Sequence, residues 1–486
     1  MTAASLSGPR LRQDSRLVEP GDVFVLIDGI VPARAEWIGG ALERGASEVW
    51  CDPTLDGLDA WLADEQAASR VIPIPNLVDR IGELASAWYG NPQAHLTTFG
   101  VTGTNGKTST VQLLAQAWAE LGHTAATIGT LGAAMHGDEL TLNGYTTPPI
   151  TRLHELLAEF LARGATHVAI EVSSHALEEQ RVDGIEFAAV HYSNLTRDHL
   201  DYHGSMEHYA AQKAKIYELP GEPLAIGNLD DAEVRSRWES LPPGRARVGL
   251  TSRGEPEAEI RAEHIAYDRA VTRFELATPE GRVELTTPLI GRFNVDNLLA
   301  VIAELRREGV GLDEIARIVP KLRPPHGRMW RIHPDTSLPM IVVDAGHTPD
   351  AMRQAVAAIG EYGYERIITV FGATGDRDPG KRPEMARYVE AGSDIVIVTD
   401  DDVHDEDGDQ IVAQLLAAME HPEAALVERD RTSAVRLALS IATPDDVILL
   451  AGKGHEPFQI VANDEHVPYS DIETAERLAR ELLAGR

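Results

Sequence analysis

The chain has 486 residues, of which 44 are basic and 76 acidic, so its formal net charge is −32. This acidity argues against nucleic acid as a partner, because binding phosphate chains requires basic patches. The single Cys51 excludes a disulfide framework, and no stretch reaches the ~18 apolar residues of a membrane span, so we expect a soluble, cytoplasmic protein of roughly three domains.

The first 95 residues predict a small α/β unit. The turn Pro20-Gly21 stands directly before the alternating apolar strand 23–26, and residues 37–45 have helical spacing. Ahead of the strand, Asp14-Ser15-Arg16 either hydrogen-bonds a polar ligand or forms only a turn. A linker at residues 91–93 ends this unit.

The next part of the chain contains a glycine loop, Gly103-Thr104-Asn105-Gly106-Lys107-Thr108, between the apolar run 96–101 and a helical run from residue 109. A strand, a glycine loop and a helix N-terminus in this order bind phosphate, because backbone N–H groups and the helix dipole face the anion. Lys107 would reach the β- and γ-phosphates of a nucleoside triphosphate, and the Thr108 hydroxyl would hold Mg²⁺. The loop has fewer residues between its glycines than the usual motif, so a simple turn is the alternative.

Strands predicted at 96–101, 124–129, 166–172 and 186–193 alternate with helices at 107–121, 150–163 and 206–217. This alternation is typical of a mostly parallel sheet covered on both faces.

Polar side chains follow two of these strands. Glu171 would hold a nucleotide-bound metal or would only cap its strand. The segment 193–203, which includes His199, indicates metal or phosphate binding or a solvated loop. Lys213, on the following helix, is by composition a surface charge.

Residues 220–290 contain three alternating segments, 258–266, 271–277 and 282–288, which predict an antiparallel appendage. Asn297 lies near the start of the next helix, where it either contacts a nucleobase or caps the helix, and capping is favoured. The proline pair at 324–325 marks a second linker.

From about residue 329 the pattern predicts a third α/β unit. Its strands end at Asp344, Phe371, Val398 and Leu450, and each is followed by a polar loop. Because the carboxyl ends of parallel strands share one edge, these loops should meet there and face the nucleotide across a cleft.

Five segments together carry a family resemblance: the glycine loop, residues 171–177, residues 194–204, residues 375–383 and residues 451–456. In content and order they resemble the Mur ligases, most closely the MurE type, over nearly the whole chain. The resemblance implies a monomeric, three-domain α/β protein with a UDP-sugar domain (1–93), a central P-loop ATPase domain (94–325) and a Rossmann-like amino-acid domain (326–486). It also implies an ATP-dependent ligase that joins an amino acid to UDP-N-acetylmuramoyl-L-alanyl-D-glutamate in peptidoglycan precursor synthesis.

The resemblance also implies roles for individual residues. Those expected to bind ATP are Gly103, Thr104, Asn105, Gly106, Lys107, Thr108, Asn297, Arg328 and Asp344. Those expected to hold Mg²⁺ are Thr108, Glu171, His199 and Lys213, the last as N6-carboxylysine. Those expected to bind the muramoyl substrate are Ser15, Arg16, Thr146, Thr147, Ser173 and Arg181, and those expected in the amino-acid pocket are Arg377, Asp401, His404, Gly452 and Glu456. The expected catalytic residues are Lys107, Lys213, His199 and Arg377.

The sequence departs from the family in the amino-acid pocket. The diaminopimelate enzymes carry Asp-Asn-Pro-Arg where this chain has Asp401-Asp402-Val403-His404, and histidine cannot reproduce the bidentate pairing of arginine with a distal carboxylate. The neighbouring residues are acidic: Asp400, Asp401, Asp402, Asp405, Glu406 and Asp407. We therefore expect a basic amino acid such as lysine or ornithine.

Further departures lie at Trp330, at Ala345-Gly346 and in the sugar loop near residues 30–33. The ATP-binding parts are retained, whereas both substrate ends differ. Two alternatives follow, namely a MurE-like paralogue that uses a different carboxylate, and a non-catalytic nucleotide-binding protein. The retained metal set disfavours the second, because a protein that only binds nucleotide would not need it.

Overall fold

The computed structural model describes residues 8–27, 32–141, 144–269, 271–332, 335–376 and 379–484. They divide into two compact units. The first unit comprises Met1–Thr251, Glu255–Ile260 and Leu299–Gly309, and the second comprises Ser252–Gly254, Arg261–Leu298 and Val310–Arg486. The domain limits expected from the sequence stay predictions.

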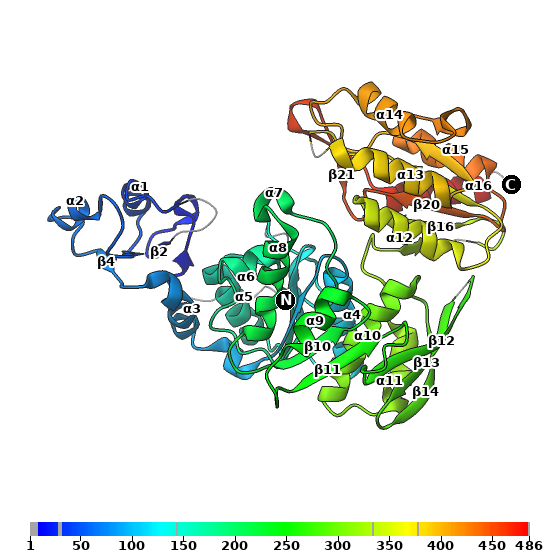
Figure 1. The fold of residues 1–486 in the computed structure, drawn as a ribbon. Helices are drawn as coiled ribbons and strands as arrows, with labels where there is room; N and C mark the ends of the chain where they lie inside the picture. Colours follow the sequence, from blue (N-terminus) through cyan, green and yellow to red (C-terminus); the bar gives the residue numbers. More distant parts are fainter. Residues whose placement is uncertain are drawn as a thin grey trace. The chain divides into compact units, whose positions relative to one another are not determined.

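The N-terminal part of the first unit is a four-stranded parallel sheet. Its order is β1 (Leu11–Arg12), β2 (Val23–Leu26), β3 (Glu48–Cys51), β4 (Val71–Pro73). Phe24 and Leu26 share a core with helix α1 (Trp37–Glu43), whereas Val23 and Val25 share a core with α3 (Leu77–Trp88), so the two helices cover opposite faces of β2 (Figure 1). The strand and helix expected in this region are confirmed.

Within the first unit, the strands of the central sheet follow the order β11-β10-β9-β5-β8-β6-β7. Its strands are β5 (Thr97–Thr102), β6 (Ala125–Gly129), β7 (Gly132–Met135), β8 (His167–Glu171), β9 (Ala189–Tyr192), β10 (Leu224–Asn228) and β11 (Arg247–Thr251). The pairings are parallel except for the β6–β7 hairpin, which the sequence did not predict. Strand β5, which leads into the glycine loop, lies between β8 and β9.

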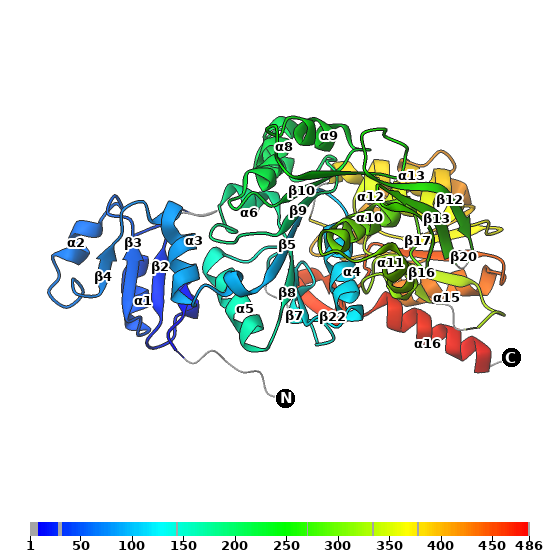
Figure 2. The ribbon, with the colours of Figure 1, turned by 90° about the horizontal axis from the view of Figure 1, so that it is seen from below.

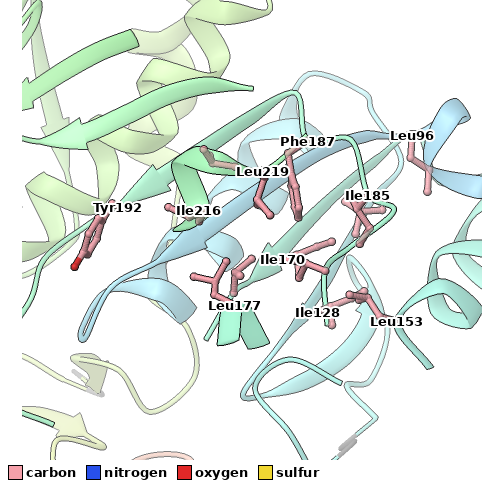
Figure 3. Packing of buried hydrophobic residues seen from close by; sticks show 14 of the residues in the cluster. Leu96, Ile128, Leu153, Ile170, Leu177, Ile185, Phe187, Tyr192, Ile216 and Leu219 are labelled. Atoms are coloured by element: carbon pink, nitrogen blue, oxygen red, sulfur yellow. The ribbon is translucent and has the colours of Figure 1, made fainter. Parts of the chain in front are cut away.

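Helices cover both faces of this sheet, as expected. They are α4 (Lys107–Glu120), α5 (Ile150–Ala162), α6 (Ser174–Glu178), α7 (Leu200–His203), α8 (Met206–Ala214) and α9 (Ala232–Glu239). Helix α4 packs on β6 and β8, and α5 and α6 lie on the opposite side (Figure 1). Figure 3 shows the apolar core on that side, to which α5 contributes Leu153, β8 contributes Ile170 and α6 contributes Leu177.

The second unit begins with the expected antiparallel strands β12 (Ile260–Asp268), β13 (Val271–Thr278) and β14 (Gly281–Thr287). Helix α10 (Arg292–Arg307) starts there and runs into the first unit, and α11 (Leu312–Ile318) follows. None of the helices in the described ranges is long and apolar enough to cross a membrane.

The C-terminal sheet of the second unit has the order β15-β16-β20-β17-β18-β19. Its strands are β15 (Trp330–Ile332), β16 (Met340–Asp344), β17 (Ile367–Phe371), β18 (Ile395–Val398), β19 (Leu426–Val427) and β20 (Val447–Ala451), and all pairs except β15–β16 are parallel. Helices α12 (Pro349–Gly360) and α13 (Arg382–Gly392) lie on one face, and α15 (Arg431–Ile441) and α16 (Asp471–Ala484) on the other (Figure 2). Helix α14 (Gly408–Ala417) shares the core of α12 and α13, and the hairpin β21 (Phe458–Val461) and β22 (Glu465–Pro468) forms a separate small sheet.

A buried ion pair joins α15 to α16 and provides a test of this packing. Arg431 contacts Asp471 through two hydrogen bonds of 2.8 Å, and both side chains are fully buried. We expect Asp471→Asn to lower the local free energy of unfolding by about 3–5 kcal/mol, because it leaves an unpaired buried charge. Hydrogen exchange of the β20 amides in the full-length protein measures this loss. Glu481→Gln, which removes the exposed partner of Arg477, should cost less than about 1 kcal/mol, and equal losses in the two variants would contradict the prediction.

Candidate active site

The glycine loop joins β5 to α4 in the order expected from the sequence. Gly103 and Gly106 have φ values of +144° and +91°, which residues with a side chain rarely adopt. A Cβ on Gly103 would also lie 1.9 Å from Ser193 Oγ. Asn194, which follows β9, holds the loop through two hydrogen bonds. Its backbone carbonyl accepts the Thr104 N–H (3.0 Å), and its side-chain oxygen accepts the Asn105 N–H (2.9 Å).

Two lysines converge on the same backbone carbonyl of this loop. Lys107 Nζ donates to Gly103 O (2.7 Å) and to Thr104 O (3.0 Å), and Lys213 Nζ donates to Gly103 O (2.8 Å). Lys213 is buried and its Nζ lies 4.7 Å from the centre of the Tyr209 ring. The surface position expected from composition is therefore wrong. Burial, together with the neighbouring Lys107, lowers the pKa of Lys213 well below its usual value, which favours the neutral amine.

Glu171 is the last residue of β8 and pairs in register with Val101 of β5. Because β5 leads into the glycine loop, Glu171 lies at the neighbouring strand end. Glu171 Oε1 accepts the backbone N–H of Thr130 (3.0 Å), and Oε2 accepts its hydroxyl (3.2 Å). Thr130 Oγ1 also lies 3.1 Å from Thr146 Oγ1. Thr130 was not identified from the sequence, where it is one of many threonines.

The residues expected at the muramoyl substrate are in contact with the same strand end. Thr147 Oγ1 donates to Glu171 O (2.7 Å) and accepts the Ser173 N–H (3.0 Å). Arg181 Nη1 donates to Thr147 O (2.8 Å). The structure thus brings Thr146, Thr147, Ser173 and Arg181 together beside the expected metal carboxylate.

His199 lies at the start of α7 with φ +51°, and its ring is close to that of His175, with centroids 5.2 Å apart. His199 is exposed, whereas His203, at the end of α7, is buried, and its Nε2 lies 2.9 Å from Ser174 Oγ. Burial, with the charge of a nearby His175, lowers the pKa of His203 to about 4. The sequence singled out this segment but gave no role to His203.

Ser15 and Arg16 lie in a short 3-10 helix, Ser15–Leu17, capped by Asp14. Asp14 accepts the backbone N–H of Arg16 (2.9 Å) and pairs with its guanidinium (2.7 Å). Asp14, Ser15 and Arg16 therefore form the turn that was expected as the alternative to ligand binding. The Arg16 side chain is 82% exposed, so it can still contact a ligand.

In the second unit, polar loops meet at the carboxyl edge of the C-terminal sheet, as predicted. Asp344 ends β16 beside Ala451 of β20, and its carboxylate accepts the N–H groups of Met329 and Gly346, each at 2.8 Å. The Arg328 N–H donates to Pro325 O (3.0 Å). A Cβ on Gly452 would lie 2.7 Å from Asp401 Oδ2, so these two predicted residues are also close.

Asn297 is not a helix cap. Helix α10 begins five residues earlier, at Arg292, and Asn297 is buried inside it, with its amide donating to Asn294 Oδ1 (3.2 Å). The capping interpretation is wrong, because Gly291 and not Asn297 precedes the helix. Arg377 lies outside the described residues.

The acidic residues around His404 are paired with groups from other parts of the chain. Asp402 contacts the buried Lys453 (2.7 Å), which also lies 3.8 Å from Asp401 and pairs with Glu456. Asp400 pairs with Arg429, and Glu406 pairs with Arg382. Asp405 accepts the Asn463 N–H, and Asp407 caps the N-terminus of α14. These carboxylates therefore do not form the open anionic pocket that the count of acidic residues indicated.

Comparisons with known proteins identify the family of this chain. Residues 101–305 match the Mur ligase middle domain, and residues 327–454 match the Mur ligase, glutamate ligase domain. The chain is 44% identical over 456 residues to UDP-N-acetylmuramoyl-L-alanyl-D-glutamate--2,6-diaminopimelate ligase of Xanthomonas campestris pv. campestris (strain 8004), covering 94% of this chain and 91% of that protein. It is 43% identical over 474 residues to the enzyme of the same name from Xylella fastidiosa (strain 9a5c), covering 98% and 94%.

Solved structures are similar over the same length. A structure of UDP-N-acetylmuramoyl-L-alanyl-D-glutamate--2,6-diaminopimelate ligase has a TM-score of 0.73 at 30% identity and covers 98% of this chain and 95% of its own. The MurF ligase from Thermotoga maritima in complex with ADP has a TM-score of 0.64 at 17% identity, with 98% of each chain covered, and shows the fold alone. The chain belongs to the Mur ligase family and, within it, to the MurE type.

Proposed function

We propose that this chain is an ATP-dependent ligase that adds the third amino acid to UDP-N-acetylmuramoyl-L-alanyl-D-glutamate. The observation that carries the proposal is the convergence of Lys107 and Lys213 on Gly103 O, in a loop next to the strand that ends in Glu171. The names of the similar ligases support the substrate. The three domain limits and the monomeric state expected from the sequence belong to the same proposal.

The chemistry requires activation of a carboxylate, which is a poor acyl donor. Transfer of the γ-phosphoryl group of ATP to the glutamate side-chain carboxylate gives an acyl phosphate and ADP. The amine of the incoming amino acid then attacks the acyl carbon, and the tetrahedral intermediate expels phosphate. Lys107 and the N–H groups of the glycine loop would stabilise the charge on the transferring phosphoryl group.

The residues around the loop fit Mg²⁺, which prefers oxygen ligands together with phosphate and water. Thr108 offers a hydroxyl and Glu171 a carboxylate, and His199 adds an imidazole. We propose that Lys213 reacts with CO₂ to form a carbamate, which would supply a further carboxylate for a second ion. Burial and the low pKa of Lys213 support this, because only a neutral amine attacks CO₂. Bound Mg²⁺ would offset the negative charge of the phosphates.

We propose diaminopimelate as the amino acid that is added. The expectation of lysine or ornithine depended on the absence of an arginine at His404 and on the acids around it, and those acids are paired with Lys453, Arg429 and Arg382. The similar ligases are named for diaminopimelate. His404 lies where the resemblance places an arginine, and its Nδ1 is 3.6 Å from Asp464 Oδ1.

Steady-state ADP release from the full-length protein tests the choice of amino acid. With UDP-N-acetylmuramoyl-L-alanyl-D-glutamate as acyl substrate, we expect kcat/KM to be at least about 10-fold higher for diaminopimelate than for lysine or ornithine. His404→Arg should increase this preference, because arginine binds a carboxylate bidentately, whereas His421→Arg on an exposed loop should not. Preference for lysine would overturn the proposal, and turnover only with another carboxylate would favour the MurE-like paralogue.

Labelling with ¹³C-bicarbonate tests the carbamate. We expect one carbonyl signal from Lys213, because its lowered pKa gives it a larger fraction of neutral amine than an ordinary lysine has at the same pH. The signal should weaken as the pH falls, because protonation of Lys213 removes the neutral amine that reacts with CO₂. Lys213→Ala should lose the signal, and its rate of ADP formation should fall by about 100- to 1,000-fold.

The matched control is Lys321→Ala, which replaces an exposed lysine and should retain both the signal and the activity. A labelled carbonyl that survives in Lys213→Ala would contradict the assignment.

A further inference from the structure

Glu178, His203 and His208 form a cluster that the proposed ligase chemistry does not use. Glu178 ends α6, His203 ends α7, and His208 lies in the first turn of α8. Glu178 Oε2 is 3.3 Å from His203 Nδ1, and Glu178 Oε1 is 3.0 Å from His208 Nε2. One ligand atom from each residue can be chosen so that all three lie within 4.8 Å of one another. Ligands of a tetrahedral ion bound at 2.0–2.1 Å are about 3.3 Å apart, so this spacing fits one ion.

Two atoms of this cluster are buried without a hydrogen bond. The His203 side chain is fully buried, and its Nδ1 faces Glu178 Oε2, yet neither atom makes a hydrogen bond within the described ranges. Buried polar atoms normally have a partner, because leaving them unsatisfied costs free energy. A cation bound between the ring nitrogen and the carboxylate oxygen would satisfy both atoms.

The surroundings orient His203 as a ligand. Its other ring nitrogen, Nε2, lies 2.9 Å from Ser174 Oγ, inside the buried part of the cluster. Histidines that bind a metal through one nitrogen almost always donate the N–H of the other to a nearby oxygen. If Nε2 donates to Ser174, Nδ1 presents its lone pair toward Glu178.

The donor set indicates the class of ion. Two imidazoles and one carboxylate suit Zn²⁺, Co²⁺ or Ni²⁺, whereas Mg²⁺ prefers oxygen ligands. His208 is 43% exposed, so solvent can reach the cluster and a water molecule can complete the coordination. Without metal, the contact between His208 Nε2 and Glu178 Oε1 is a hydrogen bond, and an ion would replace its proton.

We propose that Glu178, His203 and His208 form a binding site for a divalent transition-metal ion of the Zn²⁺ class, separate from the expected Mg²⁺ ligands. The ion would connect three helices that carry or adjoin other functional residues: α6 follows Ser173, α7 follows His199, and α8 carries Lys213. Its role is to hold these helices together.

Titration of the full-length protein with Co²⁺, in saturating Mg²⁺, tests the site. We expect the visible absorption of four-coordinate Co²⁺ at one equivalent, displaced by Zn²⁺ with release of cobalt. His208→Ala should abolish the absorption and weaken Zn²⁺ binding, measured by calorimetry, by more than about 10-fold. Glu178→Gln preserves side-chain volume and should have the same effect, so the test does not depend on the folding of one variant.

His123→Ala is the matched control. His123 is an exposed histidine of a second cluster, with His167 and Glu308, and its removal should leave the cobalt spectrum unchanged. Wild-type absorption that persists in both His208→Ala and Glu178→Gln would overturn the proposal. So would a spectrum lost only in His123→Ala, or a wild-type protein that binds no Co²⁺.

Discussion

The site depends on one backbone carbonyl, that of Gly103, which accepts hydrogen bonds from both Lys107 and Lys213. Burial lowers the pKa of Lys213, and repulsion by the nearby positive charge of Lys107 lowers it further. The arrangement requires a glycine at this position, because a Cβ would collide with Ser193. It also requires β5 to lie between β8 and β9, since those strands bring Glu171 and Asn194 to the loop. A chain built in this way presents positive charge and a reactive amine where phosphates are expected to bind.

Much of this fold follows from the sequence, because buried parallel strands are apolar runs that alternate with helices and end in polar loops. The glycine loop was predicted from this pattern. Thr147, Ser173 and Arg181 were predicted from the family resemblance. The burial of Lys213 could not be predicted from composition, since its partner Gly103 lies 110 residues earlier in the chain. Asn297 was misplaced because the pattern does not fix the first residue of α10.

The acidic segment around His404 shows why local charge in a sequence does not define a ligand. Six carboxylates within eight residues indicate an anionic pocket, and the structure instead pairs Asp402 with Lys453, Glu406 with Arg382 and Asp400 with Arg429. The partner lysine and arginines come from other parts of the chain, so no window of sequence contains both charges. These carboxylates contact the loops of the C-terminal sheet, so their number alone does not indicate a cationic ligand.

The central claim is that the glycine loop supports transfer of a phosphoryl group from ATP to the carboxylate of the acyl substrate. The most direct measurement uses a muramoyl dipeptide in which both oxygens of the glutamate side-chain carboxylate are ¹⁸O, and follows the isotope during ligation by mass spectrometry. An acyl phosphate passes one carboxylate oxygen to phosphate, so the account predicts one ¹⁸O in each phosphate released. Ligation that forms ADP and unlabelled phosphate would contradict it.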